Sequence, residues 1–206
     1  MKLIRPTATH SLSAQLYRFI SACILRIIHS FVYNFWKMTK NWSIGVNRYV
    51  SVKKHGGDLH VTIAEEGSDT KSVTFPSRRW AEFVRCIDEV NENVNALIAK
   101  QYVQLNRPIG GKWYVSMTTG FACVSIRQYY YHSVKGPSPG RQGIALRLPE
   151  WNRLKDVILQ VNQKYPALST VQPCSTQFDH QNLEGALSCS ECHPFQYDEL
   201  LHSISI

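Results

Sequence analysis

Residues 44–52 read IGVNRYVSV, and residues 109–117 read IGGKWYVSM. The two stretches align without gaps at an offset of 65 positions, and five of the nine aligned residues are identical. Unrelated stretches of this length share fewer than about one residue, so duplication explains the match better than chance. The sequence therefore predicts an internal repeat.

Each copy of this motif is followed by a turn and a second alternating stretch. After the first copy, the turn HGGD at residues 55–58 leads into LHVTI at residues 59–63. After the second copy, the turn TG at residues 119–120 leads into ACVSI at residues 122–126. A glycine-containing turn between two alternating runs is typical of a β-hairpin. Alternation places four residues on the core face of the first hairpin: Val50, Val52, Val61 and Ile63.

A helix is predicted at the end of each repeat. Apolar residues recur at alternating spacings of three and four positions from Trp80 to Leu97, and again from Trp151 to Val161. Such stripes pack against another helix or a sheet. The predicted fold class is therefore α+β, with two tandem β-β-β-β-α units at residues 42–101 and 102–168. Pairing the two units through their C-terminal helices, as an intrachain pseudo-dimer, buries both stripes.

Charge is distributed unevenly along the chain, whose formal net charge is +8. Residues 1–41 carry six basic and no acidic residues, and residues 42–168 carry seventeen basic and ten acidic residues. Residues 169–206 carry five acidic and no basic residues, and we expect them to form a flexible, cysteine-containing tail. The basic excess of residues 42–168 is expected of a surface that meets phosphates.

The first 41 residues form a basic, amphipathic leader that has more than one interpretation. An acid-free segment of this kind is typical of an organelle transit peptide, and it fits equally well a non-native extension upstream of Met38. A transmembrane span over residues 19–36 is disfavoured, because Arg26 and His29 would lie near its centre.

The second unit carries the hallmarks of a known family. Residues 124–155 read VSIRQYYYHSVKGPSPGRQGIALRLPEWNRLK. This stretch resembles the positive cofactor four family of RNA polymerase II transcriptional coactivators, which has an Ile-Arg strand rich in aromatic residues, a Pro-Gly-Arg-Lys-Gly-Ile loop and a helix opened by Trp. The strand at residues 45–52 is also similar, so the resemblance covers about residues 42–165. It implies curved antiparallel sheets that dimerise through their helices and grip single-stranded DNA in the nucleus.

The resemblance transfers unevenly to individual residues. Arg127 and Tyr130 occupy the positions of the family's strand arginine and terminal aromatic residue. Arg141 keeps the loop arginine, whereas Gln142 replaces the loop lysine. The Pro-Gly-Arg loop is missing from the first unit, whose linking stretch is eleven residues long instead of nineteen. We therefore expect one strong half-site, in the second unit, and one weak one.

The predicted contact surface mixes aromatic, hydroxyl and basic side chains. Exposed bases of single strands stack on Tyr or Phe at about 1–3 kcal/mol per base, while Lys and Arg neutralise phosphates. Packing of the sheet is the alternative role for the same tyrosines. The predicted nucleic-acid-binding residues are Arg127, Tyr129, Tyr130, Arg141, Gln142, Phe121, Lys112, Arg48, Lys53 and Lys54.

The tail contains a weak zinc motif. Cys174, Cys189, Cys192 and His193 offer four ligands, but Cys174 stands alone and His193 directly follows Cys192, unlike the paired ligands of a zinc knuckle. We therefore expect no metal or other cofactor and treat zinc as the alternative. The sequence also lacks the spacing of a phosphate-binding loop or a nucleophile elbow, so we expect no enzymatic activity.

Together these patterns predict a transcriptional coactivator or regulator of the nucleus that binds single-stranded or melted DNA. The transcription machinery is the expected protein partner, further self-association stays open, and neither a small-molecule substrate nor a membrane is expected. Two alternatives remain. One is a protein-interaction module that keeps the fold but has lost nucleic-acid binding, and the other is a mitochondrial single-strand-binding protein whose leader is a transit peptide.

Overall fold

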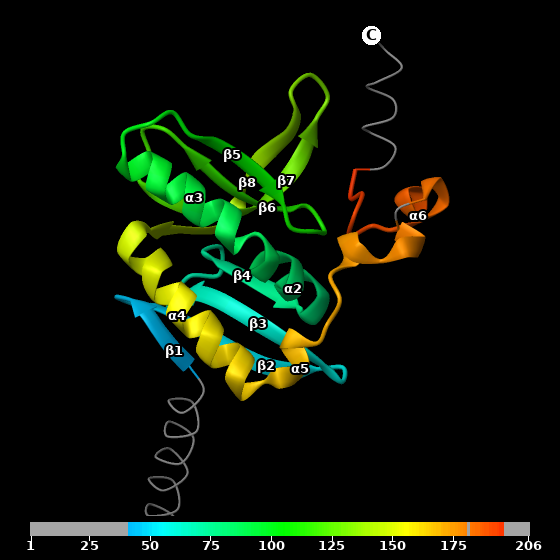
Figure 1. Cartoon of the computed structure of the whole chain (residues 1–206), viewed down its shortest axis with the longest axis horizontal. Coiled ribbons are helices and arrows are strands. Elements are labelled where there is room, and N and C mark those ends of the chain that lie inside the picture. Colours follow the sequence, from blue (N-terminus) through cyan, green and yellow to red (C-terminus); the bar gives the residue numbers. More distant parts are fainter. Residues whose placement is uncertain (1–40, 181, 196–206) are drawn as a thin grey trace, which may run out of the picture. The chain divides into compact units, whose positions relative to one another are not determined.

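The computed structural model describes residues 41–180 and 182–195. The predicted transit peptide, extension or membrane span lies in residues 1–40, outside the described residues. Among the helices of the described ranges, none is both long and apolar enough to span a bilayer. Two four-stranded sheets, each followed by helices, make up an α+β fold (Figure 1), which confirms the α+β part of the predicted fold class.

The first sheet consists of β1 (Asn41–Gly45), β2 (Arg48–His55), β3 (Asp58–Glu65) and β4 (Ser72–Pro76), hydrogen-bonded in sequence order. The predicted hairpin is formed by β2 and β3, with His55 paired to Asp58. Between them, Gly56 and Gly57 both have positive φ, as a tight two-residue turn requires. All four residues predicted to face the core are buried, so the face assignment is confirmed.

The second sheet consists of β5 (Gln104–Pro108), β6 (Trp113–Thr118), β7 (Cys123–His132) and β8 (Gly136–Arg147), again in sequence order. Its last two strands are ten and twelve residues long. They form a hairpin that extends beyond the rest of the sheet (Figure 1). The stretch that the sequence resemblance describes as a Pro-Gly-Arg loop is part of β8, because it pairs with β7 instead of leaving the sheet.

The helices are α2 (Ser77–Arg85) and α3 (Ile87–Ile98) after the first sheet and α4 (Leu148–Lys164) after the second. The apolar stripe after the first sheet predicts one helix, but the structure divides it at Cys86. There the backbone has φ −86° and ψ 0°, and the Cys86 N–H is shared between the carbonyls of Glu82 and Phe83. This tight turn changes the direction of the chain within the stripe.

One apolar core is shared by both sheets and their helices. Trp80 on α2 and Trp151 on α4 are both fully buried at its centre. Trp80 Nε1 donates to Asn162 Oδ1 at 3.1 Å, and Trp151 Nε1 donates to Asn91 Oδ1 at 3.0 Å. Trp151 and Asn162 lie 71 positions after Trp80 and Asn91, respectively, so the two hydrogen bonds are reciprocal. Both belong to the compact unit that begins at Trp42.

The chain after α4 forms short helical segments where the sequence predicts a flexible tail. These are α5 (Pro166–Ser169), the 3₁₀ turns η1 (Cys174–Thr176) and η2 (Phe178–His180), and α6 (Leu183–Ser188). Several hydrogen bonds connect this tail to the preceding sheets and helices. Ser175 Oγ donates to Glu82 Oε2 on α2 at 2.5 Å, and the Gly111 N–H donates to the Glu191 carbonyl at 3.0 Å.

Candidate nucleic-acid interface

A β-bulge shapes the outer part of the second sheet. The register between β7 and β8 shifts between Arg127 and Tyr129, which bends and twists the hairpin at this point. Two glycines of β8 permit its backbone to approach β7 closely at the bulge. A Cβ on Gly140 would lie 2.7 Å from the Gln128 carbonyl oxygen, and one on Gly143 would lie 2.6 Å from Arg127 Cα. The glycines therefore allow β8 to follow the bulged strand.

A stack of aromatic rings lies beside the bulge. The Tyr114 and Tyr129 rings are stacked with their centroids 4.3 Å apart. Phe195, from the tail, completes a buried cluster with these two rings, and its centroid lies 5.6 Å from that of Tyr131. Tyr129 is only 7% exposed, so packing is its role in this structure. The stack forms one wall of a surface groove.

This groove has a volume of about 340 Å³ and runs along the bulged hairpin. Tyr130 contributes a ring that is 51% exposed, and Arg141 and Gln142 are exposed beside it. The lining residues are Lys112, Gln128, Tyr129, Tyr130, Tyr131, Gly140, Arg141, Gln142 and Phe195. Five of the ten residues predicted to bind nucleic acid therefore line one groove.

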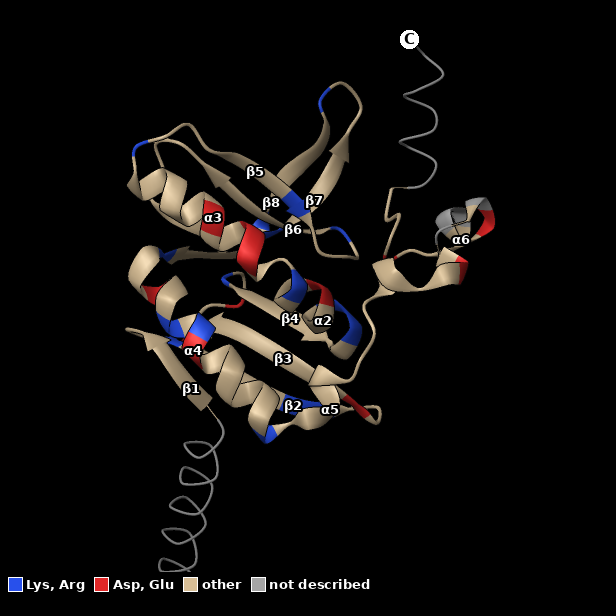
Figure 2. Ribbon diagram, in the orientation of Figure 1, with Lys and Arg blue, Asp and Glu red and all other residues tan. Residues whose placement is uncertain are grey.

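The charged groups at the groove are basic. Lys112, in the turn between β5 and β6, places its Nζ 5.4 Å from the centroid of the Phe195 ring. Arg127 lies next to the groove, where its Nη1 donates to the Gly140 carbonyl at 3.1 Å and so ties the two strands together. Figure 2 shows Lys and Arg on β7 and on the turn before β6, whereas Asp and Glu mark α3 and the tail segments.

Three other predicted residues lie apart from the groove's lining. Phe121 is 69% exposed in the turn between β6 and β7. Lys53 and Lys54 are exposed at the end of β2, on the first sheet. These side chains are accessible, but the structure does not gather them with the groove residues.

Arg48 performs a structural task instead of facing a ligand. Its guanidinium forms ion pairs with Glu65 at 3.0 Å and with Glu150 at 2.5 Å, and it also donates to the Ala145 carbonyl at 2.7 Å. Hydrogen bonds from Lys71 and from Arg48 hold the pKa of Glu65 below its ordinary value of 4.5. Because two carboxylates and a backbone carbonyl engage its guanidinium, Arg48 is less available to a phosphate than the exposed Arg141.

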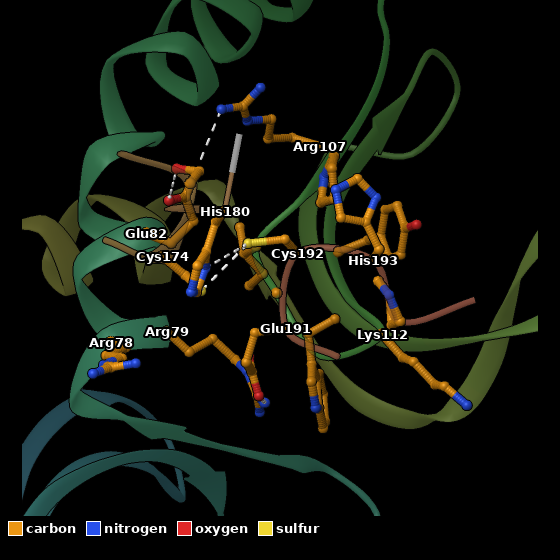
Figure 3. Close-up of a pocket in the computed structure, with 17 residues that line it drawn as sticks. Arg78, Arg79, Glu82, Arg107, Lys112, Cys174, His180, Glu191, Cys192 and His193 are labelled. Atoms are coloured by element: carbon orange, nitrogen blue, oxygen red, sulfur yellow. Dashed lines mark hydrogen bonds and ion pairs between the residues drawn. The ribbon is translucent and has the colours of Figure 1, made fainter. Parts of the chain in front are cut away.

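Four of the cysteines in the described residues bear on possible chemistry. Cys86 is buried between α2 and α3, and burial raises the pKa of its thiol to about 12, which makes it a poor nucleophile. Cys174, Cys189 and Cys192 lie together in the tail. Cys174 and Cys192 also line a second cavity of about 570 Å³ (Figure 3). The histidine beside them is His180, whereas the sequence pattern points to His193.

Sequence reasoning missed Phe195 and His180. Both belong to the tail, and neither has a periodic pattern around it that would indicate burial or ligation. Their positions depend on how the tail folds back over α2 and β6, which residue spacing does not reveal.

Residues 115–157 match the model of the family described as Transcriptional Coactivator p15 (PC4). This stretch is therefore similar to the PC4 family. The PC4 match begins in β6, includes the bulged hairpin and ends in α4, so it contains Tyr129, Tyr130, Arg141 and Gln142. It covers β7, β8 and most of β6 in the second sheet, and it includes neither β5 nor any strand of the first sheet. No curated protein matches the chain.

Proposed function

We propose that this protein binds single-stranded or locally melted DNA in the groove of the bulged β7–β8 hairpin and acts as a transcriptional coactivator or regulator. One observation carries the proposal. Within the PC4 match, the hairpin brings an exposed tyrosine, an arginine and a glutamine to one basic groove. Single-strand binding is what the family resemblance implies.

Each side chain of the groove has a separate role in this proposal. The exposed face of Tyr130 stacks on a base, which contributes about 1–3 kcal/mol. Arg141 and Lys112 neutralise phosphates, so binding weakens as salt rises. The Gln142 amide offers both a donor and an acceptor to a base edge. Duplex DNA binds more weakly because its base faces are already stacked.

We also propose that the chain contains two tandem copies of the coactivator unit, paired as an intrachain pseudo-dimer. The reciprocal hydrogen bonds from Trp80 to Asn162 and from Trp151 to Asn91 support this arrangement. A twofold-related contact of this kind is expected where the same surface of two similar units meets itself. The backbone bond from the Gly143 N–H to the Thr70 carbonyl, 3.0 Å long, joins the two sheets.

The two half-sites are unequal in this proposal. The β3 and β4 strands are eight and five residues long, so the first sheet has no counterpart of the long bulged hairpin. Its exposed Lys53 and Lys54 provide charge without a neighbouring groove of stacked tyrosines. We therefore assign strong binding to the second sheet and weak, mainly electrostatic binding to the first.

We propose the nucleus as the site of action, following the family resemblance, with the mitochondrion as the alternative if residues 1–37 are a transit peptide. Fluorescent fusions that begin at Met1 and at Met38 separate the two. Nuclear signal from both supports the nuclear assignment, and mitochondrial signal from the longer fusion alone contradicts it.

A fluorescence-anisotropy titration tests DNA binding. Labelled single-stranded and duplex oligonucleotides of one length are titrated at two salt concentrations. We expect tighter binding to the single strand than to the duplex. R141A should weaken single-strand binding and lower the slope of log affinity against log salt concentration by about one. R153A is the matched control, because Arg153 is exposed on α4, outside the groove. An equal loss of single-strand affinity in R141A and R153A, or no binding of the wild type at micromolar concentration, contradicts the proposal.

A protein-interaction module is the second candidate function. The burial of Tyr129 under Phe195 and the glutamine at position 142 favour it, because both reduce the surface that a base or phosphate would meet. The same titration separates the two functions. A protein that binds neither oligonucleotide, while it still captures a protein partner through the hairpin, fits the second candidate.

A further inference from the structure

Four side chains of the tail converge on one point. Cys174 Sγ, His180 Nδ1, Cys189 Sγ and Cys192 Sγ all lie within 4.8 Å of one another. Cys174 Sγ lies 2.9 Å from His180 Nδ1, 3.4 Å from Cys189 Sγ and 3.3 Å from Cys192 Sγ. Thiols are weak hydrogen-bonding groups, so contacts between neutral thiols do not explain why three of them gather around an imidazole nitrogen.

The spacing of these atoms suits a tetrahedral zinc ion. Zinc–sulfur bonds of about 2.3 Å place two sulfur ligands about 3.8 Å apart, and a sulfur and a nitrogen ligand about 3.6 Å apart. The Cys192 Sγ–His180 Nδ1 separation of 3.5 Å fits directly. The three separations from Cys174 Sγ need to widen by about 0.4–0.7 Å to reach zinc geometry, which small rotations of the side chains provide.

The backbone holds each ligand in a short, hydrogen-bonded turn. Cys189 and Cys192 form a Cys-x-x-Cys turn in which the Cys192 N–H lies 3.5 Å from Cys189 Sγ and the His193 N–H donates to the Cys189 carbonyl at 2.9 Å. The Cys192 N–H, which points at Cys189 Sγ, stabilises the thiolate form of that ligand. His180 turns Nδ1 toward the sulfurs, and its Nε2 lies 3.9 Å from Asp179 Oδ1, on the side where zinc-binding histidines meet a carboxylate.

The tail also lacks an apolar core of its own. Among the residues of 170–195 whose burial the structure describes, the buried hydrophobic residues are Cys174 and Phe195. Small segments with so little apolar burial are usually held by a metal or by disulfides. The tail nevertheless bridges two elements, because Arg79 Nε on α2 donates to Glu191 Oε2 at 3.1 Å and the Glu191 carbonyl accepts from Gly111.

We propose that Cys174, His180, Cys189 and Cys192 bind a structural Zn²⁺ ion that fixes the tail against α2 and the β5–β6 turn. Four protein ligands leave no open position, which is the arrangement of a structural site. This site is independent of the proposed DNA binding. The fourth ligand of this site is His180, whereas residue spacing indicates His193. Figure 3 shows His180 beside Cys174 and Cys192, and His193 on the far side of Cys192.

Metal analysis of the full chain tests this site. Protein purified from zinc-supplemented cells is dialysed against metal-free buffer with a non-thiol reductant, and zinc per chain is then measured by mass spectrometry. We expect about one zinc per chain in the wild type, and at least a fivefold loss in H180A and C192S. H193A and C123S are matched controls that keep the metal, because neither residue belongs to the cluster.

Two further measurements make the outcome decisive. The ligands lie outside the apolar core, so the near-ultraviolet circular dichroism of the buried tryptophans should persist in H180A. A chelator should speed proteolysis of the tail in the wild type more than in H180A. Zinc below one tenth of an equivalent in folded wild-type protein, loss of zinc from H193A but not H180A, or a disulfide within the cluster in protein kept reduced would overturn the proposal.

Discussion

Trp80 donates its indole N–H to Asn162 at 3.1 Å, across the boundary between α2 and α4. The indole is fully buried, so this hydrogen bond satisfies a donor that water cannot reach. The reciprocal hydrogen bond, from Trp151 to Asn91, satisfies the N–H of the second buried indole in the same way. The two bonds therefore join α4 to α2 and to α3.

We predict that N162A lowers the free energy of unfolding by about 1–3 kcal/mol, because it leaves the Trp80 N–H buried without an acceptor. N91A should have a similar effect through Trp151. N95A, an exposed position of α3, is the control and should change stability little. Urea denaturation followed by tryptophan fluorescence measures all three. A loss of unfolding free energy in N95A as large as that in N162A would contradict the stabilising role of the two tryptophan–asparagine hydrogen bonds.

Arg48 connects the first sheet to the start of α4 through Glu150. The R48M substitution keeps much of the volume but removes the cation paired with Glu150 and one of the two cations paired with Glu65, which keeps Lys71. We predict a loss of about 1–3 kcal/mol in unfolding free energy, with single-strand affinity unchanged. R153M is the exposed control. A large fall in DNA affinity with little change in stability would instead indicate that Arg48 contacts DNA.

Glu65 gives the protein a specific dependence on acid. Its pKa is held below 4.5 in the folded state by Lys71 and Arg48, so its contribution to stability is complete above pH 4.5 and disappears as the pH falls through the folded pKa. We predict that E65Q is less stable than the wild type near neutral pH and that the difference shrinks below pH 4.5. Urea titrations across this range measure it, and a difference that stays constant with pH would contradict the prediction.

Phe195 covers the tyrosine stack beside the groove. Because Tyr129 is 7% exposed under this ring, F195A uncovers an aromatic face on which a base can stack. We predict that F195A tightens single-strand binding several-fold, within the range of about 1–3 kcal/mol for one stacked base. F178A, which removes a ring that is 89% exposed in the tail, should have no effect. Weaker binding by F195A would show that Phe195 itself contacts DNA.

Much of the sheet structure could be predicted from the sequence, because alternation and glycine turns act locally. The β2–β3 hairpin has the predicted turn, with His55 paired to Asp58, and the predicted core face. The helix after β4 was harder to predict. Its apolar stripe continues across Cys86, and only the shared hydrogen bond at that residue shows that the helix breaks.

The site was predictable only in part, because several side chains are set by contacts between distant residues. Tyr130, Arg141 and Gln142 meet in the groove because they lie on paired neighbouring strands. Arg48 follows no such local rule, since its partner Glu150 lies 102 residues away. Likewise, His180 joins the three cysteines through two turns of the tail, whereas residue spacing favours His193.

Ultraviolet cross-linking of the full chain to oligo(dT), mapped by peptide mass spectrometry, tests the central claim most directly. The proposal places bases against the bulged hairpin, so adducts should concentrate on Tyr130 and the rest of residues 128–142, and R141A should reduce them where R153A does not. Adducts confined to the first sheet or to α4, with residues 128–142 unmodified at saturating oligonucleotide, would contradict it.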